Sequence, residues 1–90
     1  MYSIIIVSYH SDYDLKLCIN SIIKHNDIGN NLEIIVVDNA RSIKTKKTIE
    51  SYDGVHYVEG ENAGFGHANN IGASLAKNDY LLFLNPDTIL

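Results

Sequence analysis

Four apolar runs, separated by stretches of mixed polarity, constrain the fold of this 90-residue chain more than any other feature. The runs cover residues 3–8, 33–37, 55–58 and 80–84. The first, second and fourth are continuous and do not alternate in polarity. Continuous runs are typical of strands covered on both faces, and such strands are normally parallel. We therefore interpret the four runs as strands of one parallel sheet.

The segments between the runs show helical patterns of different strength. In the first, apolar residues recur at three- and four-residue spacing, after Ser11 or Asp12 as the N-cap and before Gly29 as the end. These apolar residues are Leu15, Cys18, Ile19, Ile22 and Ile23. Residues 42–52 are mostly polar and predict a short or irregular helix. In the third segment one helical face carries Ala68, Ile71, Leu75 and Ala76.

The strict alternation of strands and helices predicts an α/β fold. We expect one domain over residues 1–90, with a Rossmann-like parallel sheet of about four strands, flanking helices and right-handed crossovers. The turns after the first, second and fourth strands then lie at one edge of the sheet. That edge, at the carboxyl ends of the strands, is where open α/β sheets bind ligands.

Charge and composition exclude several classes of function. The net charge is −4 and the chain has no basic run, so we expect no nucleic-acid partner. The single cysteine, Cys18, is interpreted as a buried small hydrophobe. No apolar run approaches the ~20 residues that span a bilayer. We expect a cytoplasmic protein, which reaches the inner face of the membrane only if further sequence supplies the contact.

Polar side chains gather at the predicted carboxyl edge. Ser8 and Tyr9 follow the first strand, Asp38 follows the second, and Asp87 follows the fourth after Asn85 and a proline. A carboxylate at a strand tip can accept hydrogen bonds from a ribose or a base, or bind a hard cation. Two such acids on one edge favour a ligand site. In the alternative interpretations, Asp38 caps the following helix and Tyr9 is a half-buried aromatic over the sheet end.

A glycine- and asparagine-rich segment precedes the last predicted helix. It contains Asn62, Gly64, Gly66, Asn69 and Asn70. The glycines resemble a dinucleotide fingerprint, but the last glycine is missing and the segment follows the third strand, which makes a nicotinamide dehydrogenase a weak alternative. No Gly-Lys-Ser/Thr sequence is present, so a P-loop is excluded. The glycines either make a tight helix entry or let the backbone approach a ligand, and the asparagines favour the second.

Four segments in this order resemble the N-terminal, donor-binding half of family 2 glycosyltransferases with the GT-A fold. They are residues 4–9, 34–39, 61–66 with 69–72, and 82–87, and from the first to the last they span nearly the whole chain. The Asn-Pro-Asp form of the last segment is similar to the branch that includes rhamnosyltransferases of bacterial surface polysaccharides. The resemblance implies transfer of a sugar from a UDP- or dTDP-linked nucleotide-sugar to a polysaccharide or glycan acceptor.

The resemblance also implies roles for individual residues. Asp87 would hold a Mg²⁺ or Mn²⁺ ion that bridges the diphosphate. Many family members have Asp where Asn85 stands and Arg where Asn69 stands. No residue is assigned as the catalytic base. The nucleotide-sugar would contact Ser8, Tyr9, Asp38, Asn62, Gly64, Asn69, Asn70 and Asn85.

Length adds two expectations. Family members run well beyond residue 90, so we expect this chain to be a truncated donor-binding portion that is inactive alone. The alternative is a non-catalytic remnant that binds a nucleotide or associates with itself. Because the fourth strand would lack its usual neighbours, we also expect self-association through an exposed sheet edge.

Overall fold

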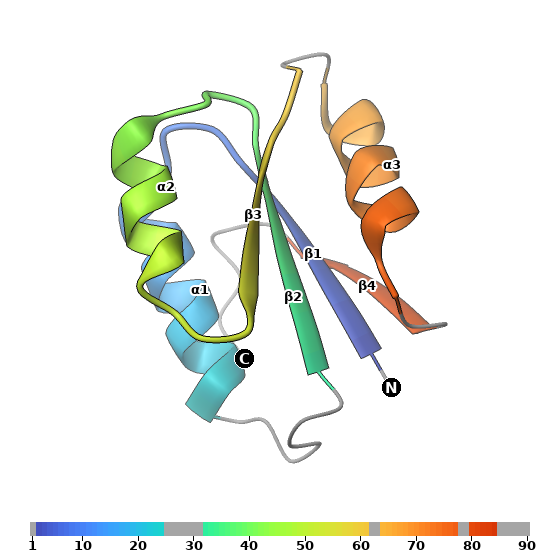
Figure 1. Ribbon diagram of the computed structural model, residues 1–90, viewed down its shortest axis with the longest axis horizontal. Coiled ribbons are helices and arrows are strands. Elements are labelled where there is room, and N and C mark those ends of the chain that lie inside the picture. Colours follow the sequence, from blue (N-terminus) through green and yellow to red (C-terminus); the bar gives the residue numbers. More distant parts are fainter. Residues whose placement is uncertain (1, 25–31, 62–63, 78–79, 85–90) are drawn as a thin grey trace.

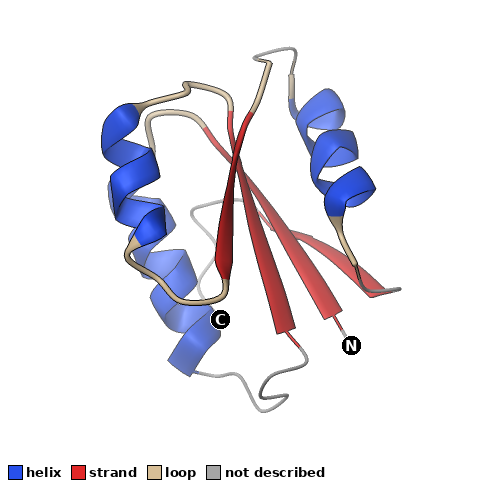
Figure 2. Ribbon diagram, viewed as in Figure 1, coloured by secondary structure: helices blue, strands red, loops and turns tan. Residues whose placement is uncertain are grey.

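The computed structural model describes residues 2–24, 32–61, 64–77 and 80–84, and it confirms the α/β prediction. Within these residues, four strands alternate with three helices (Figure 2). The elements are β1 (Tyr2–Ser8), α1 (Asp12–Lys24), β2 (Leu32–Asp38), α2 (Ile43–Glu50), β3 (Val55–Glu59), α3 (Phe65–Leu75) and β4 (Tyr80–Leu84).

The four strands form one sheet in the order β3-β2-β1-β4, and every neighbouring pair is parallel. From β1 the chain adds β2 and then β3 on one side, and it returns to place β4 on the other side of β1 (Figure 1). The direction of winding therefore reverses between β1 and β4. The carboxyl ends of the strands at such a reversal form the crevice in which α/β sheets bind ligands.

Helices cover both faces of the inner strands, which explains the continuous apolar runs. α1 and α2 lie on one face and α3 on the other (Figure 1). Ile4 and Ile6 belong to the core beneath α1 and α2, whereas Ile5 and Val7 belong to the core beneath α3. Because successive side chains of a strand point to opposite faces, both sets in β1 must be apolar. Cys18 is fully buried in the first core, as expected.

β4 has a continuous apolar run like β1 and β2, but it shows the exposure expected of a strand that lacks its usual neighbours. Leu81, Leu82 and Phe83 are 40%, 45% and 46% exposed. Adjacent residues of a strand point to opposite faces, so apolar side chains are exposed on both sides of β4. The reason is its position, because β4 is the last described strand on its side of the sheet and pairs with β1 alone.

One helix matches the sequence-based expectation and another differs from it. α2 is the short helix expected, and its N-cap is Ser42, whose side chain accepts a hydrogen bond from the Thr45 N–H at 3.4 Å. In α3, Leu75 was expected on the buried face but is 50% exposed. Gly72 is buried instead, and a Cβ there would lie 2.5 Å from the Ile5 side chain. The small side chains of α3 let the helix approach the sheet closely, which moves Leu75 out of the contact.

Candidate functional site

The carboxyl ends of β1, β2 and β3 lie side by side and bring several predicted site residues to one edge. Ser8 lies opposite Asp38 in the parallel register, and Asp38 lies opposite Glu59. The ladder continues one step further, because the Asn39 N–H donates to the Ser8 carbonyl at 2.9 Å and the Gly60 N–H to the Asp38 carbonyl at 2.8 Å. We call this region the carboxyl edge.

Asp38 is at the centre of the carboxyl edge and is completely buried. Its Oδ1 accepts hydrogen bonds from the Ala40 N–H at 3.1 Å and the Ser8 hydroxyl at 3.4 Å. Its Oδ2 accepts from the Tyr57 hydroxyl at 2.8 Å and the Ser42 N–H at 2.9 Å. An ionised carboxylate has about four acceptor positions, so these donors use essentially its full capacity.

This hydrogen bonding gives Asp38 a structural role. It joins β1, β3 and the loop into α2, and one of its bonds goes to the N–H of Ser42, the residue that begins α2. Asp38 is not the cap of the following helix, as the alternative interpretation had it, because the N-cap of α2 is Ser42, to whose N–H Asp38 is bonded. Direct contact of Asp38 with a ligand stays a prediction.

Tyr57 and Gly60 are the residues of this edge that the sequence analysis missed. Tyr57 reaches Asp38 from β3, and burial together with the adjacent carboxylate raises the pKa of its hydroxyl well above the ordinary value. A Cβ on Gly60 would overlap the side-chain oxygen of Asn39, so only glycine fits without rearrangement. The alternation of β3 places Tyr57 on the face of α1 and α2, but no sequence signal links its hydroxyl to Asp38.

Tyr9 is more accessible than its alternative interpretation assumed. It is 55% exposed, and its ring meets the His10 ring edge-on at a centroid distance of 4.6 Å. His10 itself has a left-handed backbone, with φ of 51°. The Ser11 hydroxyl donates to the Tyr9 carbonyl at 2.9 Å, which fixes the turn. An exposed aromatic ring at a strand tip is suited to stacking on a planar base.

The start of α3 adds a second feature to the carboxyl edge. Gly64 precedes the helix with φ of 95°, which favours glycine, and a Cβ there would meet nothing within 4 Å. The helix has no side-chain cap and no acidic residue in its first turn. Its first N–H groups and the positive end of its dipole therefore remain available to an anion.

The structure separates the two predicted asparagines of α3. Asn69 is half-buried and Asn70 is exposed. Neighbouring helical residues project about 100° apart, so the two side chains leave the helix in different directions, and their contact with a ligand stays a prediction. His67 makes a contact of 3.0 Å with Glu61, and both side chains are exposed.

Three predicted residues, Asn62, Asn85 and Asp87, lie outside the described residues. Within the parts of the chain that the structure does describe, no group of three or more His, Cys, Asp or Glu side chains has the geometry of a metal site. The metal prediction therefore depends on Asp87 and is not tested. The described helices are all too short or too polar to cross a membrane.

Residues 3–90 match Glycosyl transferase family 2. The chain belongs to this family. It is 42% identical over 98 residues to rhamnosyltransferase WbbL of Escherichia coli K12, with the whole of this chain aligned to 36% of that protein. It is 34% identical over 90 residues to the low-salt glycan biosynthesis hexosyltransferase Agl10 of Haloferax volcanii, with 94% of this chain aligned to 27% of that protein. The chain thus spans about a third of the length of these relatives.

The solved structures confirm the fold. Residues 1–349 of Staphylococcus aureus TarS superpose with a TM-score of 0.86 at 24% identity, covering 98% of this chain and 28% of that chain. The mannosyltransferase PcManGT from Pyrobaculum calidifontis, in complex with GDP-Man and Mn²⁺, gives a TM-score of 0.86 at 20% identity with the same coverage. The sheet and its helices therefore have the arrangement expected of part of a GT-A glycosyltransferase.

Proposed function

We propose that this chain is the donor-binding portion of a glycosyltransferase that moves a sugar from a UDP- or dTDP-linked donor to a polysaccharide or glycan acceptor. The observation that carries the proposal is the ordered carboxyl edge in a chain of this family. There, the Asp38 hydrogen bonds join three strand tips beside the uncapped start of α3. The naming of the relatives WbbL and Agl10 as sugar transferases supports the reaction class.

Each residue at the edge has a proposed role. Tyr9 stacks on the base, and the N–H groups after Gly64 receive the negative charge of the donor. A ligand hydroxyl or base N–H that contacts Asp38 has to replace one of its four donors. The Ser8 hydroxyl, at 3.4 Å, is the most weakly bound, and once displaced it can bond the ligand itself. The remaining proposed contacts are Asn62, Asn69, Asn70 and Asn85.

A divalent cation is part of the proposal, with Asp87 as its protein ligand. The complex of PcManGT with GDP-Man and Mn²⁺ supports a metal in a protein of the same fold. When bound, Mg²⁺ or Mn²⁺ neutralises the charge of a departing diphosphate. A single carboxylate is a weak ligand set, so we expect metal affinity to depend on the nucleotide.

The test is isothermal titration of the chain with UDP, dTDP and GDP, each with and without Mn²⁺. We expect metal-dependent binding of one of these nucleotides, and its loss in Asp87→Ala. Asp53→Ala, at an exposed position in the turn before β3, is the matched control and should bind like the unmodified chain. If none of the three nucleotides binds with or without metal, the donor-binding proposal is wrong.

We also propose that the 90-residue chain does not turn over by itself, because no residue in it is assigned as the base that activates the acceptor. The measurement is release of nucleotide from a nucleotide-sugar in the presence of glycan acceptors. Sustained release that depends on acceptor would contradict this proposal while leaving donor binding intact.

The alternative, a self-associating module, is favoured by one observation. Leu81, Leu82 and Phe83 are exposed on a strand at the edge of the described sheet. A second copy that pairs its own β4 in antiparallel orientation would extend the sheet and cover these side chains. Sedimentation velocity should show a dimer at high concentration, and Leu82→Lys should shift it toward monomer. A single monomeric species across the concentration range would exclude the association.

A further inference from the structure

Tyr57 combines a core contact with a hydrogen bond to the site. Its ring packs against the core beneath α1 and α2, and its hydroxyl donates to Asp38 Oδ2 at 2.8 Å. The hydroxyl therefore comes from the sheet, through a ring held by packing, whereas two of the other donors to Asp38 are N–H groups of the following loop. Tyr57 is the donor that ties the carboxylate to β3.

The position of the carboxylate decides the shape of the loop. Asp38 Oδ2 also accepts from the Ser42 N–H, and Oδ1 accepts from the Ala40 N–H. Between these two anchored peptides, Arg41 has a left-handed backbone with φ of 50°. Rotation about the terminal torsion of an aspartate is soft, so the carboxylate needs an external donor to hold one orientation. A left-handed arginine persists only where its surroundings fix it.

We propose that Tyr57 is a positioning residue of the donor-binding edge, which holds the Asp38 carboxylate and through it the loop of residues 39–42. It does not touch the nucleotide. Its effect on binding comes from presenting Asp38 and the adjacent loop in one fixed geometry. The inference rests on the proposed function, since the affinity that Tyr57 improves is affinity for the donor nucleotide.

The chemistry of the phenol suits this task. Burial and the hydrogen bond to Asp38 raise the pKa of the Tyr57 hydroxyl, so it remains a donor throughout the neutral and mildly alkaline range. A bond from a neutral donor to a carboxylate is charge-assisted and stronger than one between neutral groups.

Tyr52 provides a matched control. Its ring packs against the same core, and its hydroxyl also donates to a side-chain oxygen, that of Asn20, at 2.9 Å. That bond joins the turn after α2 to α1, away from the carboxyl edge. Tyr57→Phe and Tyr52→Phe each delete one hydroxyl and keep the ring, so the two variants differ in what the hydroxyl holds.

The experiment measures nucleotide affinity and loop geometry in the same proteins. Titration with UDP and dTDP in the presence of Mn²⁺ should show about tenfold weaker binding in Tyr57→Phe, because binding would then have to order the Asp38 carboxylate and its loop. In the ¹H–¹⁵N correlation spectrum of the free protein, the amide signals of Ala40 and Ser42 should move. Tyr52→Phe should leave both the affinity and these two signals unchanged.

A double variant tests whether the effect passes through the carboxylate. In an Asp38→Asn background, Tyr57→Phe should change the affinity by less than about twofold, because the two groups act as one unit. Three results would overturn the inference: loss of affinity of equal size in Tyr52→Phe, amide shifts in Tyr57→Phe with unchanged affinity, or full additivity in the double variant. Absence of nucleotide binding in the unmodified chain would instead reject the proposed function, and the inference with it.

Discussion

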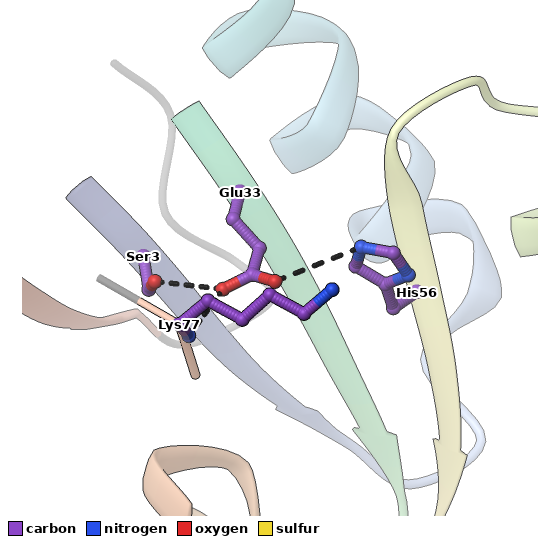
Figure 3. A network of polar contacts seen from close by, with 4 residues as sticks. All are labelled: Ser3, Glu33, His56 and Lys77. Carbon is purple, nitrogen blue, oxygen red and sulfur yellow. Dashed lines mark hydrogen bonds and ion pairs between the residues drawn. The ribbon is translucent and has the colours of Figure 1, made fainter. Parts of the chain in front are cut away.

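Each end of β2 has a carboxylate that links neighbouring strands by hydrogen bonds, and the two carboxylates differ in what else they hold. Glu33, near the amino end, accepts a hydrogen bond at 2.8 Å from Ser3, its register partner on β1. Asp38, at the carboxyl end, accepts one from its own register partner, Ser8. Each carboxylate also has a partner on β3, which is His56 for Glu33, at 3.7 Å. Figure 3 shows the Glu33 end.

The remaining donors make the difference. Glu33 Oε1 also accepts from the Lys77 N–H at 3.0 Å, which ties the segment after α3 to the sheet (Figure 3). A shallow pocket of about 210 Å³ lies beside Glu33, His56 and Lys77. At the other end, two loop amides converge on Asp38, which is completely buried, whereas the Glu33 side chain keeps 12% of its surface exposed. Glu33 at the amino end thus ties the segment after α3 to the sheet, and Asp38 at the carboxyl end holds the loop before α2 in shape.

The largest effect should come from removing the buried carboxylate. Asp38→Ala leaves the donors of Ala40, Ser42 and Tyr57 without their acceptor, so we expect a loss of about 3–5 kcal/mol in the free energy of unfolding. Urea titration followed by circular dichroism measures it. Asp53→Ala, at an exposed position, should stay within about 0.5 kcal/mol. Equal losses in the two variants would contradict a special role for Asp38.

The next effect tests how tightly the carboxyl end is packed. Gly60→Ala places a methyl group on the Asn39 side-chain oxygen and should destabilise by about 1–3 kcal/mol. Gly66→Ala is the control, because a Cβ there meets nothing within 4 Å and the position lies in α3. It should stabilise by about 0.5–1 kcal/mol, since alanine favours helix. The two midpoints of thermal unfolding should therefore move in opposite directions.

The hydrogen bonds and charge contacts of Glu33 should make the free energy of unfolding depend on pH. Burial alone raises the pKa of this carboxyl, but hydrogen bonds from the Lys77 N–H and the Ser3 hydroxyl, with the positive charges of His56 and Lys77, outweigh it and hold the pKa below its ordinary value of 4.5. A lowered folded pKa means that the stabilisation is complete above pH 4.5 and is lost as the pH falls through the folded value.

Glu33→Gln should accordingly cost about 1 kcal/mol at pH 7 and much less at pH 3. Unfolding titrations of both proteins at the two pH values measure this difference. Lys46→Gln, at an exposed position of α2, also changes the net charge by one unit, and its effect on stability at the two pH values serves as the background. A cost that is as large at pH 3 as at pH 7 would show that charge on Glu33 does not contribute.

The smallest effects are expected for Ser3 and Ser8, the serines that lie opposite Glu33 and Asp38 in the strand register. Ser3 and Ser8 are both buried, but the Ser3 bond is 2.8 Å long and the Ser8 bond 3.4 Å. Ser3→Ala should cost about 1 kcal/mol and Ser8→Ala about 0.5 kcal/mol. The reverse order, measured under the same conditions, would mean that Ser8 is held more firmly than the distance indicates.

The strands could be predicted because their signal is local. Continuous apolar runs fixed β1 and β2 within a residue or two, and the helical spacing of Leu15, Cys18 and Ile22 located α1. The buried face of α3 was harder to predict from the sequence. Its contact depends on Gly72 against Ile5, and a glycine contributes nothing to an apolar pattern. The exposure of β4 depends on strand order, which the run itself does not encode.

The sequence by itself determined the α/β class, the family, and the placing of Ser8, Tyr9 and Asp38 at strand ends, because these follow from periodicity and from segments of fixed order. Tertiary structure decided what Asp38 does. Its four donors come from residues that lie up to 30 positions away in the chain, and only the register of β1 with β2 and β3 brings them to one carboxylate. Hydrogen bonds of that kind depend on strand pairing, which no local pattern records.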